Sequence, residues 1–135
     1  MTDITVVSVK HTGSKFLSKL LCCDFTHYHG KPHGNIASPI RDPYLVYQTW
    51  YSRRKLNLDD MWKEWDIFNR TFLRQKVWVV SVDKHIGLEE LSNHIGRKLE
   101  TDWEPVGSLK RIQAPEIDLS PIYNLEVVKR YGYGI

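Results

Sequence analysis

The chain has 135 residues and a formal net charge of +3, with 26% charged and 41% hydrophobic residues. This length suits one globular domain, residues 1–135, and is too short for two. The mild positive charge argues against a nucleic-acid-binding arm or stripe and suits a small anionic ligand.

The cysteines and the apolar segments indicate the compartment. Cys22 and Cys23 are adjacent, and adjacent cysteines rarely bridge each other, so we expect no disulfide framework. No signal peptide is visible at the N-terminus, and no apolar run approaches the length of a membrane span. The sequence therefore predicts a cytoplasmic protein without membrane contact.

The chain begins with a strand, a turn and a helix. Residues 4–9 form a β-branched run that predicts a buried strand. The turn Thr12-Gly13-Ser14 ends this run, and Ser14 is a candidate N-cap for a helix over residues 14–23.

Two short strands and a helix are predicted next. The strands lie at residues 24–29 and 35–40. Pro39 favours an edge strand or a strand end for the second, because proline has no N–H to donate to a ladder. Pro43 fits the first turn of a helix that runs to about residue 54.

The second half continues this alternation. Asp59 and Asp60 open a helix with one apolar stripe, made of Met61, Trp62, Trp65, Phe68 and Phe72. Residues 77–82 predict a central parallel strand, and residues 87–99 an amphipathic helix. Residues 101–119 are expected to be irregular, before a helix from Ser120 to Arg130.

Alternating strands and helices predict an α/β fold. We expect a P-loop-like three-layer sandwich with a small, mainly parallel sheet of about four strands. Ligands in such folds bind at the carboxyl ends of the strands. Residues 10–16, 27–34, 40–42 and 82–86 are therefore expected to surround one site.

The segment from Lys10 to Leu17 has the character of a phosphate-binding loop. A turn that enters a helix aims backbone N–H groups and the positive helix end at an anion. Gly13 permits close backbone approach, while Ser14 and Lys15 add a hydroxyl and a cation. The segment is not a complete Walker A motif, and an ordinary capped helix explains it equally well on this evidence alone.

Arg41 follows the strand predicted at residues 35–40. Its planar guanidinium suits bidentate phosphate binding, and Thr49, eight residues later, can present a hydroxyl nearby. A surface turn of Arg41 and Asp42 is the alternative.

Three histidines lie close together in the sequence, at His27, His29 and His33. A neutral histidine at a strand's carboxyl end can remove a proton from an acceptor hydroxyl. With Cys22 and Cys23 these histidines also form a candidate metal cluster, although their spacing matches no usual zinc pattern. Exposed loop histidines without a role are the remaining alternative.

In this order the segments resemble the sulfotransferases that use 3′-phosphoadenylyl sulfate (PAPS). The family's loop of the type P-K-S-G-T-T-W-L corresponds to the segment from Lys10 to Leu17. Its R-[ND]-P triplet, with a serine eight residues after the arginine, corresponds to Arg41-Asp42-Pro43 with Thr49. The resemblance covers about residues 4–99.

The resemblance implies sulfuryl transfer from PAPS, without a metal, to a hydroxyl or amine acceptor whose identity stays open. The implied nucleotide-binding residues are Lys10, Thr12, Gly13, Ser14, Lys15, Phe16, Arg41 and Thr49. The implied catalytic residues are His29 as the base, with His27 as second choice, and Lys15 and His11 beside the transferring sulfonate.

The chain also departs from the family. His11 replaces the loop lysine, and the C-terminal R-K-G-x-x-G-D-W segment has no counterpart, with Arg111 or Arg130 as unsupported stand-ins. The chain is about half the usual length, so much of an acceptor pocket would be absent, and a second copy in a homodimer could supply it.

Two other functions are compatible with these residues. A small nucleotide kinase would require Mg²⁺ and an acidic strand-end residue, for which Asp83 is the candidate. A non-catalytic relative would bind a nucleotide or a protein partner. A bacterium or a bacteriophage would be a natural setting for so compact a chain.

Overall fold

The computed structural model describes residues 3–53, 57–99 and 114–133. Its four strands are β1 (Thr5–Ser8), β2 (Phe25–His27), β3 (Ile36–Ile40) and β4 (Val77–Ser81). They form one sheet in the order β2-β1-β3-β4, and every neighbouring pair is parallel. The predicted α/β fold with a small parallel sheet is confirmed.

Six helices are seen in the described part of the chain: α1 (Ser14–Leu21), α2 (Pro43–Ser52), α3 (Leu58–Arg74), α4 (Leu88–Ile95), α5 (Ser120–Tyr123) and α6 (Glu126–Arg130). The helix expected from Ser120 to Arg130 is therefore two short helices. The chain breaks between them because Leu125 has an extended backbone, with φ −66° and ψ 140°. None of the described helices is long and apolar enough to cross a membrane.

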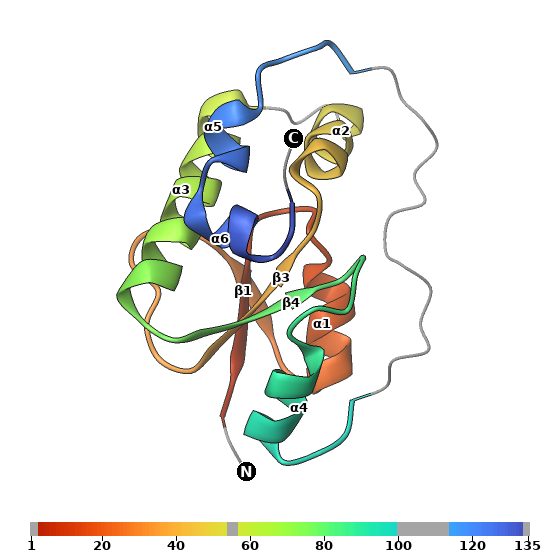
Figure 1. Cartoon of the computed structure of the whole chain (residues 1–135), viewed down its shortest axis with the longest axis vertical. Coiled ribbons are helices and arrows are strands. Elements are labelled where there is room, and N and C mark those ends of the chain that lie inside the picture. Colours follow the sequence, from red (N-terminus) through yellow and green to blue (C-terminus); the bar gives the residue numbers. More distant parts are fainter. Residues whose placement is uncertain (1–2, 54–56, 100–113, 134–135) are drawn as a thin grey trace.

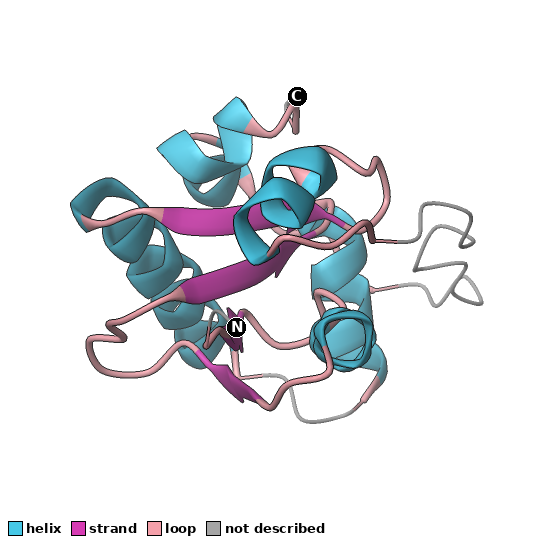
Figure 2. Ribbon diagram, turned by 90° about the horizontal axis from the view of Figure 1, so that it is seen from below, coloured by secondary structure: helices cyan, strands magenta, loops and turns pink. Residues whose placement is uncertain are grey.

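The helices cover both faces of the sheet (Figure 1). Along β1, Val6 packs toward α1 and α4, whereas Val7 belongs to the core shared with α2, α3, α5 and α6. This alternation is the period-two pattern of a strand that is buried on both faces. Figure 2 shows the sheet between its two layers of helices.

The larger core is rich in aromatic residues. Trp65 and Phe68 on α3 are fully buried, and the Tyr28 ring stacks on Phe68 with ring centroids 5.0 Å apart. The Tyr28 hydroxyl lies 2.5 Å from Ser38 Oγ, so its polar end is satisfied inside the core. Tyr28 thereby anchors the segment that leads from β2, past β1, to β3.

Pro39 lies in an interior strand, so the edge position suggested by the sequence is wrong. β3 pairs with β4 through all five of its residues but with β1 only at Ile36 and Ala37. The Ile40 carbonyl faces β4, where it accepts a hydrogen bond from Val82 N (3.0 Å). The backbone polar groups of successive residues point toward opposite neighbouring strands. The ring nitrogen of Pro39 therefore points toward β1, past the last residue pair of β1 and β3. No hydrogen bond of the sheet is lost there.

The strand order creates a switch point between β1 and β3. The connection from β1 leads outward to β2, whereas the next strand, β3, lies on the opposite side of β1. In open parallel sheets a crevice forms at the carboxyl ends of two such strands. Residues 9–13 and residues 41–42 leave the sheet at this point.

Candidate functional site

The loop after β1 enters α1 through Gly13. Gly13 has a φ of +105°, which favours glycine, and a Cβ at this position would make a tight contact of 3.2 Å with the Val82 side chain. Gly13, not Ser14, is the N-cap, and Ser14 is the buried first residue of the helix. The predicted turn into a helix N-terminus is present, with its cap shifted by one residue.

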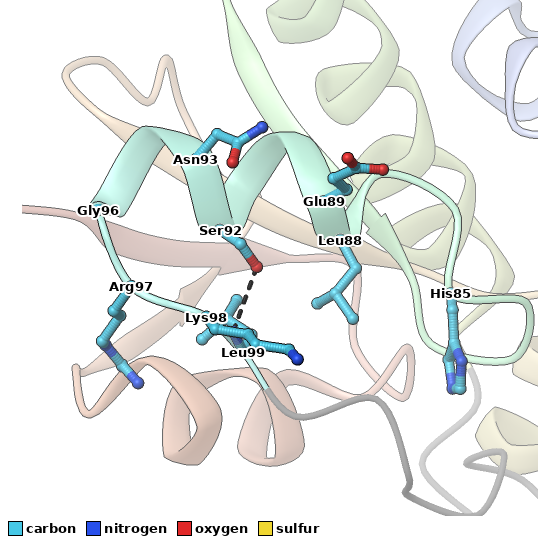
Figure 3. Close-up of a pocket in the computed structure, with 9 residues that line it drawn as sticks. All are labelled: His85, Leu88, Glu89, Ser92, Asn93, Gly96, Arg97, Lys98 and Leu99. Carbon is cyan, nitrogen blue, oxygen red and sulfur yellow. Dashed lines mark hydrogen bonds between the residues drawn. The ribbon is translucent and has the colours of Figure 1, made fainter.

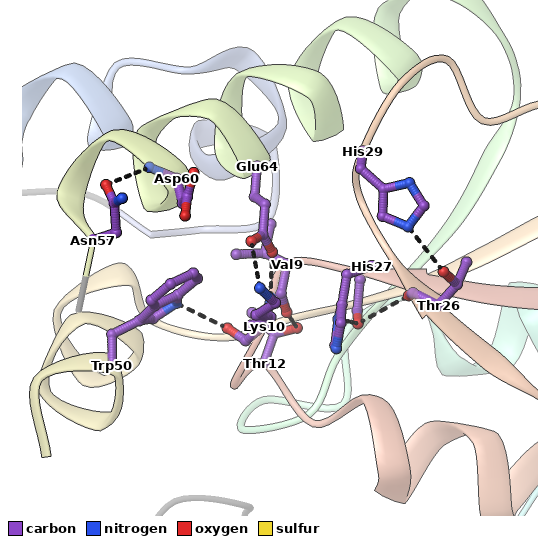
Figure 4. Close-up of polar contacts among 11 residues, drawn as sticks. Val9, Lys10, Thr12, Thr26, His27, His29, Trp50, Asn57, Asp60 and Glu64 are labelled. Carbon is purple, nitrogen blue, oxygen red and sulfur yellow. Dashed lines mark hydrogen bonds and ion pairs between the residues drawn. The ribbon is translucent and has the colours of Figure 1, made fainter. Parts of the chain in front are cut away.

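Lys10 and Thr12 are held by contacts behind the loop (Figure 4). The buried carboxylate of Glu64, on α3, accepts a hydrogen bond from Lys10 N (2.9 Å) and lies 3.6 Å from Lys10 Nζ. The Thr12 hydroxyl donates to Val9 O (2.6 Å), and Trp50 Nε1 donates to Lys10 O (3.2 Å). These bonds fix the path of the loop and turn the Thr12 side chain inward, away from a ligand.

Arg41 joins the two segments that the sequence marked as phosphate-binding. Its side chain leaves the end of β3, and its Nη1 donates to the carbonyl oxygen of His11 at 3.2 Å. Arg41 is only 3% exposed, so its guanidinium is buried near the carboxyl ends of β1 and β3 and does not lie on a surface turn. A buried, planar cation beside a loop that enters a helix is a favourable arrangement for an anion.

Positive groups gather around His11. Its ring makes an edge contact with Trp50, with centroids 5.4 Å apart. Burial, followed in decreasing order by the nearby charges of Arg53, His27, Lys10 and Arg41, lowers the pKa of His11 to about 4. His11 is therefore neutral at pH 7, and it can assist a sulfonate only as a neutral hydrogen-bond donor.

The lowered pKa of His11 predicts a specific loss of stability in acid. Folding favours the neutral imidazole, so its contribution is complete above the ordinary value of 6.5 and is lost as the pH falls toward 4. In His11→Asn, which keeps a residue tolerant of the positive φ at this position, the loss should be smaller. The check is urea unfolding of both proteins at pH 6.5 and near pH 4. Equal losses would contradict the prediction.

His27 and His29 lie near the carboxyl end of β2 and face different partners (Figure 4). His27 Nδ1 lies 3.2 Å from Ser8 Oγ at the end of β1, whereas His29 Nε2 lies 3.3 Å from Thr26 Oγ1 on the exposed side. Burial is the main cause that lowers the pKa of His27, so its imidazole is neutral at pH 7. Of the two, only His27 is among the groups that lower the pKa of His11 when they are protonated.

His33 does not join this cluster. Residues 32–34 are tied to the C-terminal end of α3, where Arg74 Nη2 donates to Pro32 O (2.5 Å) and Gln75 Nε2 donates to Gly34 O (3.0 Å). Cys22 and Cys23 are free thiols at the C-terminal end of α1, which runs away from the strands' carboxyl ends. In the described ranges, no three histidine, cysteine or acidic side chains are placed to share a metal ion, so the candidate metal cluster does not form.

The other predicted binding residues, Lys15, Phe16 and Thr49, differ from one another in exposure. Lys15 is exposed in the first turn of α1, and Phe16 is half-buried beside it. Thr49 is buried, and its hydroxyl donates to Leu45 O (3.0 Å) within α2. The Thr49 hydroxyl therefore has a partner in its own helix.

Two of the three residues named for completing or replacing this site, Asp83 and Arg130, lie within the described residues. The Asp83 carboxylate accepts hydrogen bonds from Asp42 N (3.3 Å), Ser81 Oγ (3.0 Å) and the Tyr133 hydroxyl. A carboxylate held by three donors is poorly placed to take a magnesium ion. Arg130 pairs with Glu126 and covers the Phe72 ring, so it is committed to α6 and α3, and Arg111 lies outside the described residues.

The comparisons with protein-family models, curated proteins and solved structures find no match.

A cavity of about 730 Å³ lies beside α4 and the following residues (Figure 3). Leu88 and Leu99 supply apolar lining, and His85, Arg97 and Lys98 supply basic groups. It shares no lining residue with the loop after β1. The contact between Arg41 and the loop after β1 lies at the strand ends and not at this cavity.

Sequence reasoning missed Glu64 and the tyrosines of the C-terminal segment. Glu64 falls within the apolar stripe of α3, between Met61 and Trp65, and a carboxylate at such a position was the available signal. Tyr123 and Tyr133 donate hydrogen bonds to Asp42 and Asp83, and no spacing along the chain links these residues.

Proposed function

We propose that the chain binds PAPS at the carboxyl ends of β1 and β3 and transfers its sulfuryl group to a hydroxyl or amine acceptor. The observation that carries this proposal is the hydrogen bond from Arg41 to the carbonyl of His11, because it joins the two segments that resemble the family's phosphate-binding motifs. Arg41 would hold the 3′-phosphate, and the loop from Lys10 to Phe16 the 5′-phosphosulfate. The free thiols of Cys22 and Cys23 support a reducing, cytoplasmic setting.

The chain's own residues have distinct roles in this proposal. The first N–H groups of α1, together with Ser14 and Lys15, stabilise negative charge on the sulfonate and the bridging oxygen. His27 takes the proton from the acceptor, and its neutral imidazole beside the loop favours it over the exposed His29. PAPS, when bound, supplies the sulfuryl group and leaves as adenosine 3′,5′-bisphosphate.

The proposal is tested by calorimetric titration of the whole chain with adenosine 3′,5′-bisphosphate, with and without Mg²⁺, and with ATP as the comparison. We expect binding of the bisphosphate that needs no metal and that ATP does not match. The bisphosphate is the right probe because it carries both phosphates and no reactive sulfuryl group. If ATP binds only in the presence of Mg²⁺ and the bisphosphate does not bind, the nucleotide-kinase function replaces this proposal.

A further inference from the structure

The C-terminal segment returns to the strand ends beside Arg41. Tyr133 is buried, and its hydroxyl donates to the Asp83 carboxylate and lies 2.8 Å from Ser81 Oγ. Lys84 secures the segment from the other side, because its Nζ donates to Gly132 O (2.9 Å) and lies 4.3 Å from the centre of the Tyr133 ring. A residue far from Arg41 in the sequence is thereby packed against its immediate surroundings.

Asp83 connects Tyr133 to the end of β3. One of its oxygens accepts from Tyr133 and Ser81, and the other accepts from the backbone N–H of Asp42, the residue after Arg41. Three donors from three parts of the chain therefore set the direction of this carboxylate. Removing the Tyr133 hydroxyl would leave one oxygen with a single donor.

The charge of Asp83 acts on Arg41. Burial lowers the pKa of the Arg41 guanidinium, and among the groups that oppose this change Asp83 has the largest effect, ahead of Asp42 and Tyr133. A carboxylate bonded to the backbone of the next residue, Asp42, can compete with an anionic ligand for the guanidinium. This competition is weaker when the carboxylate oxygens already accept hydrogen bonds from other donors.

We propose that Tyr133 is a positioning residue for the 3′-phosphate: its hydroxyl holds Asp83 so that Arg41 stays directed at the ligand and does not close on the carboxylate. This inference rests on the proposed function, in which Arg41 binds the 3′-phosphate. Tyr133 touches neither nucleotide nor acceptor in this arrangement and acts through Asp83 alone.

The test compares two nucleotides in the Tyr133→Phe variant of the whole chain. Adenosine 3′,5′-bisphosphate should bind about tenfold more weakly than to the wild type, as expected when one hydrogen bond to a charged group is lost. Adenosine 5′-phosphate, which lacks the 3′-phosphate, should bind as before. Tyr131→Phe is the matched control, since Tyr131 packs edge-on against Phe72, and it should leave both affinities unchanged. Equal weakening of both nucleotides, or of neither, would overturn the proposal.

A second readout needs no nucleotide. The side-chain Nε–H resonance of Arg41, assigned by its loss in Arg41→Lys, should shift in Tyr133→Phe and stay in place in Tyr131→Phe. An unchanged resonance would overturn the role of Tyr133 whatever binds, whereas a shift in a protein that ignores the bisphosphate would refute the proposed function alone. Ser81→Ala removes the other hydroxyl donor from Asp83 and replaces Tyr133→Phe if that variant does not fold.

Discussion

Replacement of Arg41 by alanine is expected to lower the affinity for adenosine 3′,5′-bisphosphate about 100-fold, the range found when one partner of a buried, hydrogen-bonded charge pair is removed. The guanidinium is almost fully buried, so water cannot substitute for it at the phosphate. Arg41→Lys keeps the charge but loses the planar fork, and it should bind with intermediate affinity. Calorimetric titration of both variants measures the effect.

The control for this prediction is Arg130→Ala. Arg130 is an exposed arginine that pairs with Glu126, so its loss should leave nucleotide affinity unchanged. Because Arg41 also bonds to the loop through His11 O, circular dichroism must first show that the Arg41 variants are folded. Wild-type affinity in a folded Arg41→Ala protein would remove the basis of the nucleotide site.

Replacement of Gly87 by alanine is expected to destabilise the fold by about 3–5 kcal/mol, from a left-handed backbone and a backbone clash together. Gly87 has a φ of +88°, and a Cβ there would lie 2.0 Å from the carbonyl oxygen of Val79. That oxygen belongs to β4, so α4 would have to move away from the sheet that it covers. Urea unfolding, monitored by circular dichroism, measures the free energy of unfolding.

Gly96→Ala separates the two contributions. Gly96 has a φ of +76° at the other end of α4, and a Cβ there would meet no atom within 4 Å. Only the strain of the left-handed backbone applies, so the free energy of unfolding of this variant should fall by about 1–2 kcal/mol. If the two alanine variants are equally stable, Gly87 does not approach the Val79 carbonyl of β4 closely enough to exclude a side chain.

The alternation of strands and helices was predictable because most of the elements contain an apolar run long enough to show its period, although β2, with three residues, does not. The break between α5 and α6 was not, since Pro121 opens a helix and nothing at Leu125 forbids its continuation. The order of the strands was not predicted either: residues 77–82, expected as a central strand, form the edge strand β4, whereas β3 lies inside the sheet. The strand order depends on which side of β1 each connection crosses, and that choice is made by packing.

For the candidate site, sequence patterns singled out the loop and Arg41 but did not predict the contacts that hold them. The bond from Arg41 to His11 O and the support of Lys10 by Glu64 join residues 30 and 54 positions apart. His33 was expected near the loop because it follows His29 closely. Instead, its segment is drawn to the end of α3 by bonds from Arg74 and Gln75.

Pro39 has a consequence for the cost of the crevice between β1 and β3. Wherever two strands separate inside a protein, the N–H groups that they no longer share must find other acceptors or lose their hydration without compensation. β3 carries a proline at the first position facing β1 beyond the last pair, so no donor there needs a new acceptor. At Pro39, β1 and β3 can therefore separate without that desolvation penalty, even though β3 is fully buried.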